Sequence, residues 1–299
     1  MNWLLFGILA QASASVAVYI DNYVLEKHLK DYSVIACATG CISFIMGLTL
    51  YAFQGFPLFS TLDTAYTLGS GILLFAYLLP YMKALEYDDP SRVVPLFQIT
   101  TLFALILSYV FYGTTLSPIH MVGFVIILAS GIVLSIESDP LKVFRLRPAF
   151  WYMMLATFLL ASSLLLFDSV SGNHTFLETF SFTSIGMGIG TLLISAWPSY
   201  TKRLRKYIPL ISPRIWLAIF TAELFNFGYQ ICLVYAVSLS TPSLAALTES
   251  TQPAIILAYG LILTRFFPSI VQEDTSRAML LRKGVVILMI ILGFYVLNL

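Results

Sequence analysis

Residues 90–111, PSRVVPLFQITTLFALILSYVF, have a counterpart later in the chain, in residues 242–263, PSLAALTESTQPAIILAYGLIL. Both stretches begin with Pro-Ser, pass through a polar patch and continue as an unbroken apolar run. A second pair keeps the same order, because ASVAVYIDNYV around Asp21 resembles ASSLLLFDSVS around Asp168. The sequence therefore predicts a chain built twice from one unit.

The composition indicates a protein that lies in a membrane. The chain has 299 residues, of which 59% are hydrophobic and only 10% are charged, whereas soluble domains are about 25% charged. Because backbone groups in hydrocarbon need partners inside their own segment, long unbroken apolar runs favour helices over barrel strands. We therefore expect an all-α membrane protein with ten transmembrane helices, near residues 2–20, 32–53, 65–87, 92–112, 118–136, 149–168, 179–197, 215–237, 241–263 and 280–298.

The two units are expected to be residues 1–140 and 141–299, two five-helix repeats within one integral membrane domain. Five is an odd number, so the second repeat would enter the membrane from the side opposite to the first. The prediction is thus a 5+5 inverted repeat, an arrangement in which transporters bind substrate between the two halves.

The positions of the basic residues agree with this membrane topology. All 16 Lys and Arg residues are assigned to the connections after the first, third, fifth, seventh and ninth spans. Since cationic loops are retained in the cytoplasm, both termini are predicted to be extracytoplasmic, in a plasma (inner) membrane. The first apolar run lacks a cationic n-region, so we interpret it as a retained helix and not a secretion signal.

The chain resembles EamA-like members of the drug/metabolite transporter superfamily. The resemblance rests on ALEYDDPSRVVPLFQITTLFALILSYVFYGTTLSPIHMVGFVIILASGIVLS over residues 84–135 and on YAVSLSTPSLAALTESTQP over residues 235–253. It implies transport of small metabolites such as amino acids, with helices one to four and six to nine around a central cavity and helices five and ten at the periphery. Ten-helix relatives usually have both termini in the cytoplasm, which conflicts with the charge pattern here.

Two carboxylates fall inside predicted spans and are the main site candidates. Asn226 and Gln230 follow Glu223 at i+3 and i+7, so the three share one helical face. Glu249 precedes Gln252 by three residues, just before a proline. A carboxylate in the bilayer costs a few kcal/mol unless it meets water, a partner or a proton. Substrate contact or proton carriage is one interpretation, and a neutral or paired Glu that joins helices is the other.

Further candidates come from other spans. Gln98 is the fourth-span counterpart of the Glu249 patch, Gln11 and Ser15 share a face of the first span, and Tyr77 and Tyr81 are one turn apart in the third. Inter-helix hydrogen bonding or simple packing explains such residues equally well.

Two acidic residues are candidates for a gate. Asp21 and Asp168 are predicted to close the first span of each half.

No catalytic residue, cofactor or metal site is predicted. The sequence has no G-x-S-x-G, H-E-x-x-H, Walker or dinucleotide-binding motif, no Cys/His spacing that suits a metal, and no basic face for nucleic acid. The expected function is secondary-active transport of small polar metabolites by alternating access, with the bilayer, a small-molecule substrate and protons as partners and a homodimer left open. A lipid or lipid-linked sugar flippase and a non-transporting membrane scaffold are the alternatives.

Overall fold

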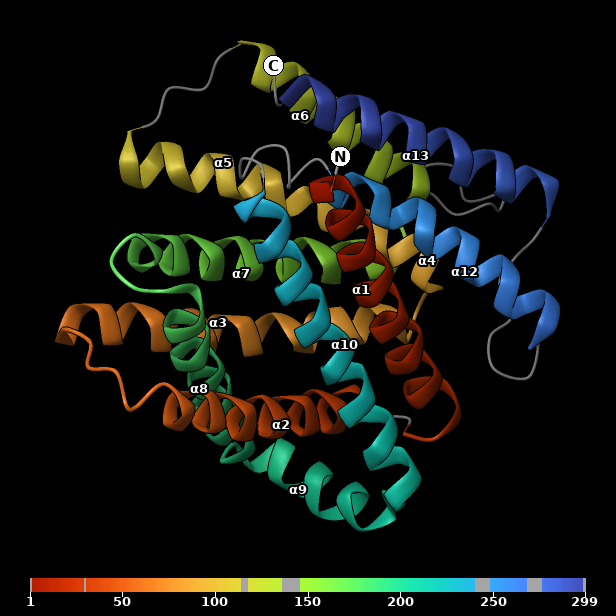
Figure 1. Cartoon of the computed structure of the whole chain (residues 1–299). Helices are drawn as coiled ribbons and strands as arrows, with labels where there is room; N and C mark the ends of the chain where they lie inside the picture. The colour runs from red at the N-terminus through yellow and green to blue at the C-terminus, as the bar shows by residue number, and fades with distance from the viewer. Residues whose placement is uncertain are drawn as a thin grey trace.

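The computed structural model describes residues 2–29, 31–113, 118–135, 146–239, 248–267 and 276–297 (Figure 1). Within these ranges the regular elements are α-helices and short 3-10 helices, as expected for an all-α protein. The elements of the first half are α1 (Asn2–Lys27), α2 (Tyr32–Phe53), α3 (Thr61–Leu85), α4 (Pro90–Val93), η1 (Val94–Gln98), α5 (Ile99–Tyr112) and α6 (Pro118–Ser135). Those of the second half are α7 (Pro148–Ser171), α8 (Phe176–Ser195), α9 (Pro198–Tyr207), η2 (Ile208–Leu210), α10 (Pro213–Ser238), η3 (Thr248–Thr251), α12 (Gln252–Phe266) and α13 (Arg277–Leu297).

Seven segments in the described part of the chain are long and apolar enough to cross a membrane. They correspond to α1, α2, α3, the α4–η1–α5 segment, α7, α8 and α10, and α12 is a shorter apolar helix. An integral membrane protein is therefore confirmed, whereas the arrangement of ten spanning helices is not. The sequence also gave no sign of α9, a short helix with four basic residues in the predicted connection between spans seven and eight.

The helices begin where the local sequence satisfies their first backbone amides. Asp31 accepts a hydrogen bond from the Ser33 amide at 3.0 Å at the start of α2, and Thr175 and Glu178 form a capping box on α8. Such caps provide partners for amides that have none inside the helix.

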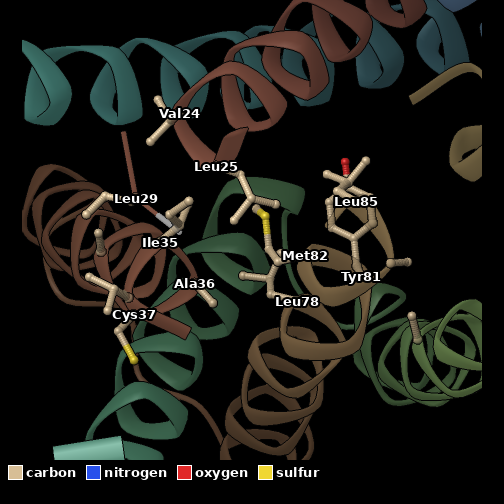
Figure 2. Close-up of a cluster of buried hydrophobic side chains, with 14 of the residues drawn as sticks. Val24, Leu25, Leu29, Ile35, Ala36, Cys37, Leu78, Tyr81, Met82 and Leu85 are labelled. Atoms are coloured by element: carbon tan, nitrogen blue, oxygen red, sulfur yellow. The ribbon is translucent and has the colours of Figure 1, made fainter. Parts of the chain in front are cut away.

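The fold is held together by pairs of helices that are far apart in the sequence. Helix α3 packs against α7 and α8, α1 against α10, α2 against α8, and α5 against α7. Helices α6 and α13 pack on each other along one edge of the molecule (Figure 1). Val24, Leu25 and Ile35 pack with Leu78 and Met82 in the largest apolar core, which joins α1, α2 and α3 (Figure 2).

Small residues allow the backbones of α3, α7 and α8 to approach closely. A Cβ atom added to Gly71 would lie 2.6 Å from the Cα of Gly186 and would also meet the carbonyl oxygen of Thr183. Ser70 and Ser163 donate to each other's backbone carbonyl oxygens at 2.9 Å and 2.8 Å. Close approach with small residues and hydroxyl bonds is typical of helix packing in membranes.

Each polar patch of the repeated stretches is partly formed by a 3-10 segment. The predicted span at 92–112 is divided by η1, which contains Pro95, and η3 directly precedes α12, whose second residue is Pro253. A proline lacks the amide that would continue an α-helix, which explains the local change. Gln98 and Glu249 therefore lie on backbone that departs from the α-helix.

The basic connections meet at one end of the molecule. Asp88 accepts from Arg92 at 3.0 Å and from Arg147 at 2.6 Å, and Arg203 lies 3.8 Å from Asp31. At the other end, His174 lies 3.2 Å from Asp63. We call the first of these the basic end.

Some basic residues lie in helices and not in the predicted connections. Arg277, Arg282 and Lys283 were assigned to the ninth connection but lie within α13, where Lys283 is buried. Arg282 remains close enough to Arg92 and Arg147 to interact with their charges, so the start of α13 is also at the basic end.

Candidate functional site

Glu223 lies about three turns inside α10, where the structure surrounds it with polar groups. Its side chain is 7% exposed. Ser43 of α2 donates to one carboxylate oxygen at 3.4 Å, and Asn226, one turn along α10, donates to the other at 3.4 Å. Glu223 and Asn226 therefore share one face of α10, as the sequence predicted. Gln230 continues it as a half-buried residue.

Aromatic rings adjoin this carboxylate. Tyr77 and Tyr81 are stacked with centroids 6.2 Å apart, and Phe97 of η1 lies 6.3 Å from the Tyr77 ring and 5.0 Å from the Tyr81 ring. Tyr77 is close enough to Glu223 to interact with its charge. The third span and the 3-10 segment of the fourth thus form an aromatic wall beside Glu223.

Asp21 joins the same cluster, which differs from the sequence prediction. Helix α1 does not end near residue 20 but continues to Lys27, so Asp21 is inside the helix and only 6% exposed. It interacts electrostatically with Glu223, Tyr77 and Tyr81. Its Oδ1 atom has no hydrogen-bond partner in the described residues. Its sequence counterpart Asp168 is exposed near the end of α7.

A second acidic position adjoins the first. Glu249 lies in η3, and its backbone carbonyl accepts a 3.5 Å hydrogen bond from Gln98 of η1. Tyr229 of α10 interacts electrostatically with both Glu249 and Tyr77, which connects the two acidic positions. The half-buried Gln252 is the first residue of α12. Both 3-10 segments therefore contribute to one polar region.

The polar face of α1 is buried, and its two candidates differ in their contacts. Ser15 donates to the Gln11 carbonyl at 2.7 Å, so its hydroxyl is used within the helix. The Gln11 amide nitrogen is buried without a hydrogen-bond partner in the described part of the chain. Gly7, one turn earlier, lies directly against Thr248 of η3. Gln11 is thus the α1 residue with an amide donor left for a ligand.

Sequence reasoning missed three residues of this region. Ser43, Phe97 and Tyr229 are a single hydroxyl and two single rings, residue types that are common in membrane helices and give no signal of their own. Only their contacts with the recognised acidic and aromatic residues show that they belong to the site. Among the described residues, no group of three or more His, Cys, Asp or Glu side chains is placed to hold a metal ion.

Comparisons with known proteins identify the kind of protein. The chain resembles 28 solved chains in fold; one crystal structure of a protein superposes with a TM-score of 0.57 at 15% identity, covering 98% of this chain and 95% of that one. No curated protein matches the sequence. The EamA-like transporter family model matches residues 1–136.

Members of that family are membrane transporters and not enzymes, in keeping with the apolar helices found here. The resemblance seen in the sequence is therefore confirmed: residues 1–136 match the EamA-like transporter family, which belongs to the drug/metabolite transporter superfamily.

Proposed function

We propose that this protein is a secondary transporter of small polar solutes that works by alternating access between two inverted five-helix repeats. The observation that carries the proposal is the cluster around Glu223. Buried acidic, amide, hydroxyl and aromatic groups from α1, α2, α3, η1 and α10 meet inside a bundle of apolar helices. Intramembrane ionisable groups are costly, which makes them candidates for substrate and proton binding.

The helix contacts support the repeat. The two halves correspond helix by helix, with α1, α2, α3, α5 and α6 equivalent to α7, α8, α10, α12 and α13. Under this correspondence the α3–α7 contact is equivalent to the α10–α1 contact, and the α3–α8 contact to the α10–α2 contact. The α5–α7 contact is likewise equivalent to the α12–α1 contact, and the α2–α8 and α6–α13 contacts are each equivalent to themselves. Such an internal two-fold relation is expected of two units with one fold.

The basic end supports the inversion. Helix α1 finishes near Asp31, which pairs with Arg203, whereas its counterpart α7 starts next to Arg147, which pairs with Asp88. Both ion pairs lie at the basic end. Helix α1 therefore runs toward that end and α7 away from it, which is the relation that alternating access between inverted repeats requires.

We further propose that Glu223 and Glu249 carry protons that drive transport. The test uses purified protein in proteoliposomes with an imposed pH gradient, and the solute is one selected from a labelled panel of amino acids and amines. We expect Glu223→Gln to lower gradient-driven uptake about tenfold or more, since glutamine cannot bind and release the proton that the gradient supplies. Glu249→Gln is expected to lower it as well. Unchanged uptake in both variants would rule out the coupling role, and lipid scrambling without solute uptake would favour a flippase.

The orientation in the plasma (inner) membrane is part of the proposal. The gathering of the basic connections at one end supports a cytoplasmic location for that end and an extracytoplasmic location for both termini. A reporter fused after Leu299 should give an extracytoplasmic signal. A cytoplasmic signal would reverse the proposed orientation and leave the transport mechanism unaffected.

A further inference from the structure

Within the described residues, the carboxylates of the candidate site have no basic partners. No Lys or Arg nitrogen in this part of the chain lies within ion-pair distance of Asp21, Glu223 or Glu249. Asp21 and Glu223 are buried, and Glu249 is half-buried. An isolated buried charge is strongly unfavourable, so these groups require a proton or another cation.

Asp21 and Glu223 differ in how their oxygens are used. Both oxygens of Glu223 accept hydrogen bonds, from Ser43 and Asn226, at 3.4 Å. Asp21, in contrast, keeps a buried oxygen without a partner, and that oxygen is an acceptor for a ligand's donor. Asp21 and Glu223 lie on α1 and α10, which pack against each other, and a positive charge held between these helices would be attracted by both carboxylates.

The wall next to these carboxylates is aromatic. The rings of Tyr77, Tyr81 and Phe97 lie 5.0 to 6.3 Å apart, and both tyrosines interact electrostatically with Asp21. The face of an aromatic ring attracts cations, and the same face packs against apolar groups. Carboxylates and ring faces together complement a molecule with a positive head and an apolar body.

We propose that the substrate is an organic cation, bound with its ammonium group between Asp21 and Glu223 and its apolar part against Tyr77, Tyr81 and Phe97. This inference rests on the proposed function and specifies its substrate class. It also gives Asp21 the role of a binding residue and not that of a gate at the end of a span.

The experiment measures binding by the purified full-length protein in lipid nanodiscs. The probes are benzyltrimethylammonium, which carries a permanent charge, 2-phenylethanol, which is neutral, and phenylacetate, which is an anion. Of the three probes, we expect only benzyltrimethylammonium to show saturable binding. Asp21→Asn and Glu223→Gln are each expected to weaken it about tenfold, which corresponds to 1.4 kcal/mol.

A matched control is Glu26→Gln, which changes an exposed acidic residue on the same helix as Asp21 and should leave the affinity unchanged. Asp21→Glu and Glu223→Asp keep the charges and should retain binding of the cation. Thermal unfolding of every variant separates lost binding from lost folding.

The outcomes distinguish this inference from the proposed function. Equal binding of the three probes, or cation binding that survives both neutralising substitutions, would overturn the cationic substrate. Gradient-driven uptake of amino acids without any binding of benzyltrimethylammonium would also overturn it, yet leave the transport function in place. The absence of uptake of every solute on the panel would instead refute the function itself.

Discussion

Gly71 of α3 and Glu223 of α10 occupy equivalent places in the two halves but do different things. Aligning Pro90 with Pro242 brings Gly71 opposite Glu223, and it also aligns Phe75 and Tyr77 with Phe227 and Tyr229. Helix α3 faces α8 at this level, and α10 faces α2. In the first half the position is filled by the backbone of the neighbouring helix, whereas in the second half it holds a carboxylate.

The difference teaches how a repeated fold acquires an asymmetric site. The absence of a side chain at Gly71 lets α3 and α8 approach until their backbones touch, and this contact needs no ligand. Glu223 meets a hydroxyl of α2 at 3.4 Å and keeps a polar region within the bundle. At this pair of equivalent positions, one half therefore provides a close backbone contact and the other a carboxylate.

The largest effect is expected from adding a methyl group at the tight contact. Gly71→Ala would direct its Cβ at the backbone of Thr183 and Gly186, and neither can move without shifting α8. Overpacking of this kind costs about 1–3 kcal/mol, and we expect the upper part of that range and a lower Tm in detergent. Gly69→Ala is the control, since its Cβ would meet only Leu166 at an ordinary 3.4 Å. Equal Tm values for the two variants would contradict a tight α3–α8 contact.

A smaller effect is expected from the serine pair in the same part of the molecule. Ser163→Ala removes the donor to the Ser70 carbonyl and leaves Ser70 still bonded to the backbone of residue 163. One hydrogen bond contributes about 1 kcal/mol, so the variant should unfold at a modestly lower temperature and transport normally. Ser162→Ala, which loses a bond only within its own helix, serves as the comparison. A loss of transport in Ser163→Ala would show that this interface is not merely structural.

The smallest change in stability is expected at Glu223. Glu223→Gln keeps an oxygen to accept from Ser43 or Asn226 and breaks no ion pair in the described residues. Because burial of the charged form is removed, we expect the free energy of unfolding to stay within about 1 kcal/mol of the parent's value, or to rise, with Tm following it. A pronounced fall in Tm would mean that the main role of Glu223 is to join neighbouring helices, which is the alternative to a role in transport. Measuring thermal unfolding and solute uptake on the same preparation of Glu223→Gln distinguishes the role in transport from the role in joining helices.

The sequence predicted the recognisable members of the site but not how they meet. Glu223, Asn226, Tyr77 and Tyr81 were identified because polar or aromatic residues one turn apart share a helical face. Asp21 was predicted to lie at the end of a span but lies inside α1, because the polar residues after position 20 gave no sign that α1 continues to Lys27. Its pairing with Asp168 as two gates stays a prediction, although the two now differ in burial.

By itself the sequence determined that this chain lies in a membrane, that its elements are helices, and that its basic residues are grouped along the chain. These properties depend on composition and on neighbours within one or two turns, which a sequence contains in full. Only the tertiary structure decided that α1 lies on α10, that Ser43 and Phe97 adjoin the acidic site, and that α3 touches α8 at Gly71. Those facts depend on contacts between residues far apart in the chain, and burial follows from packing and not from residue type.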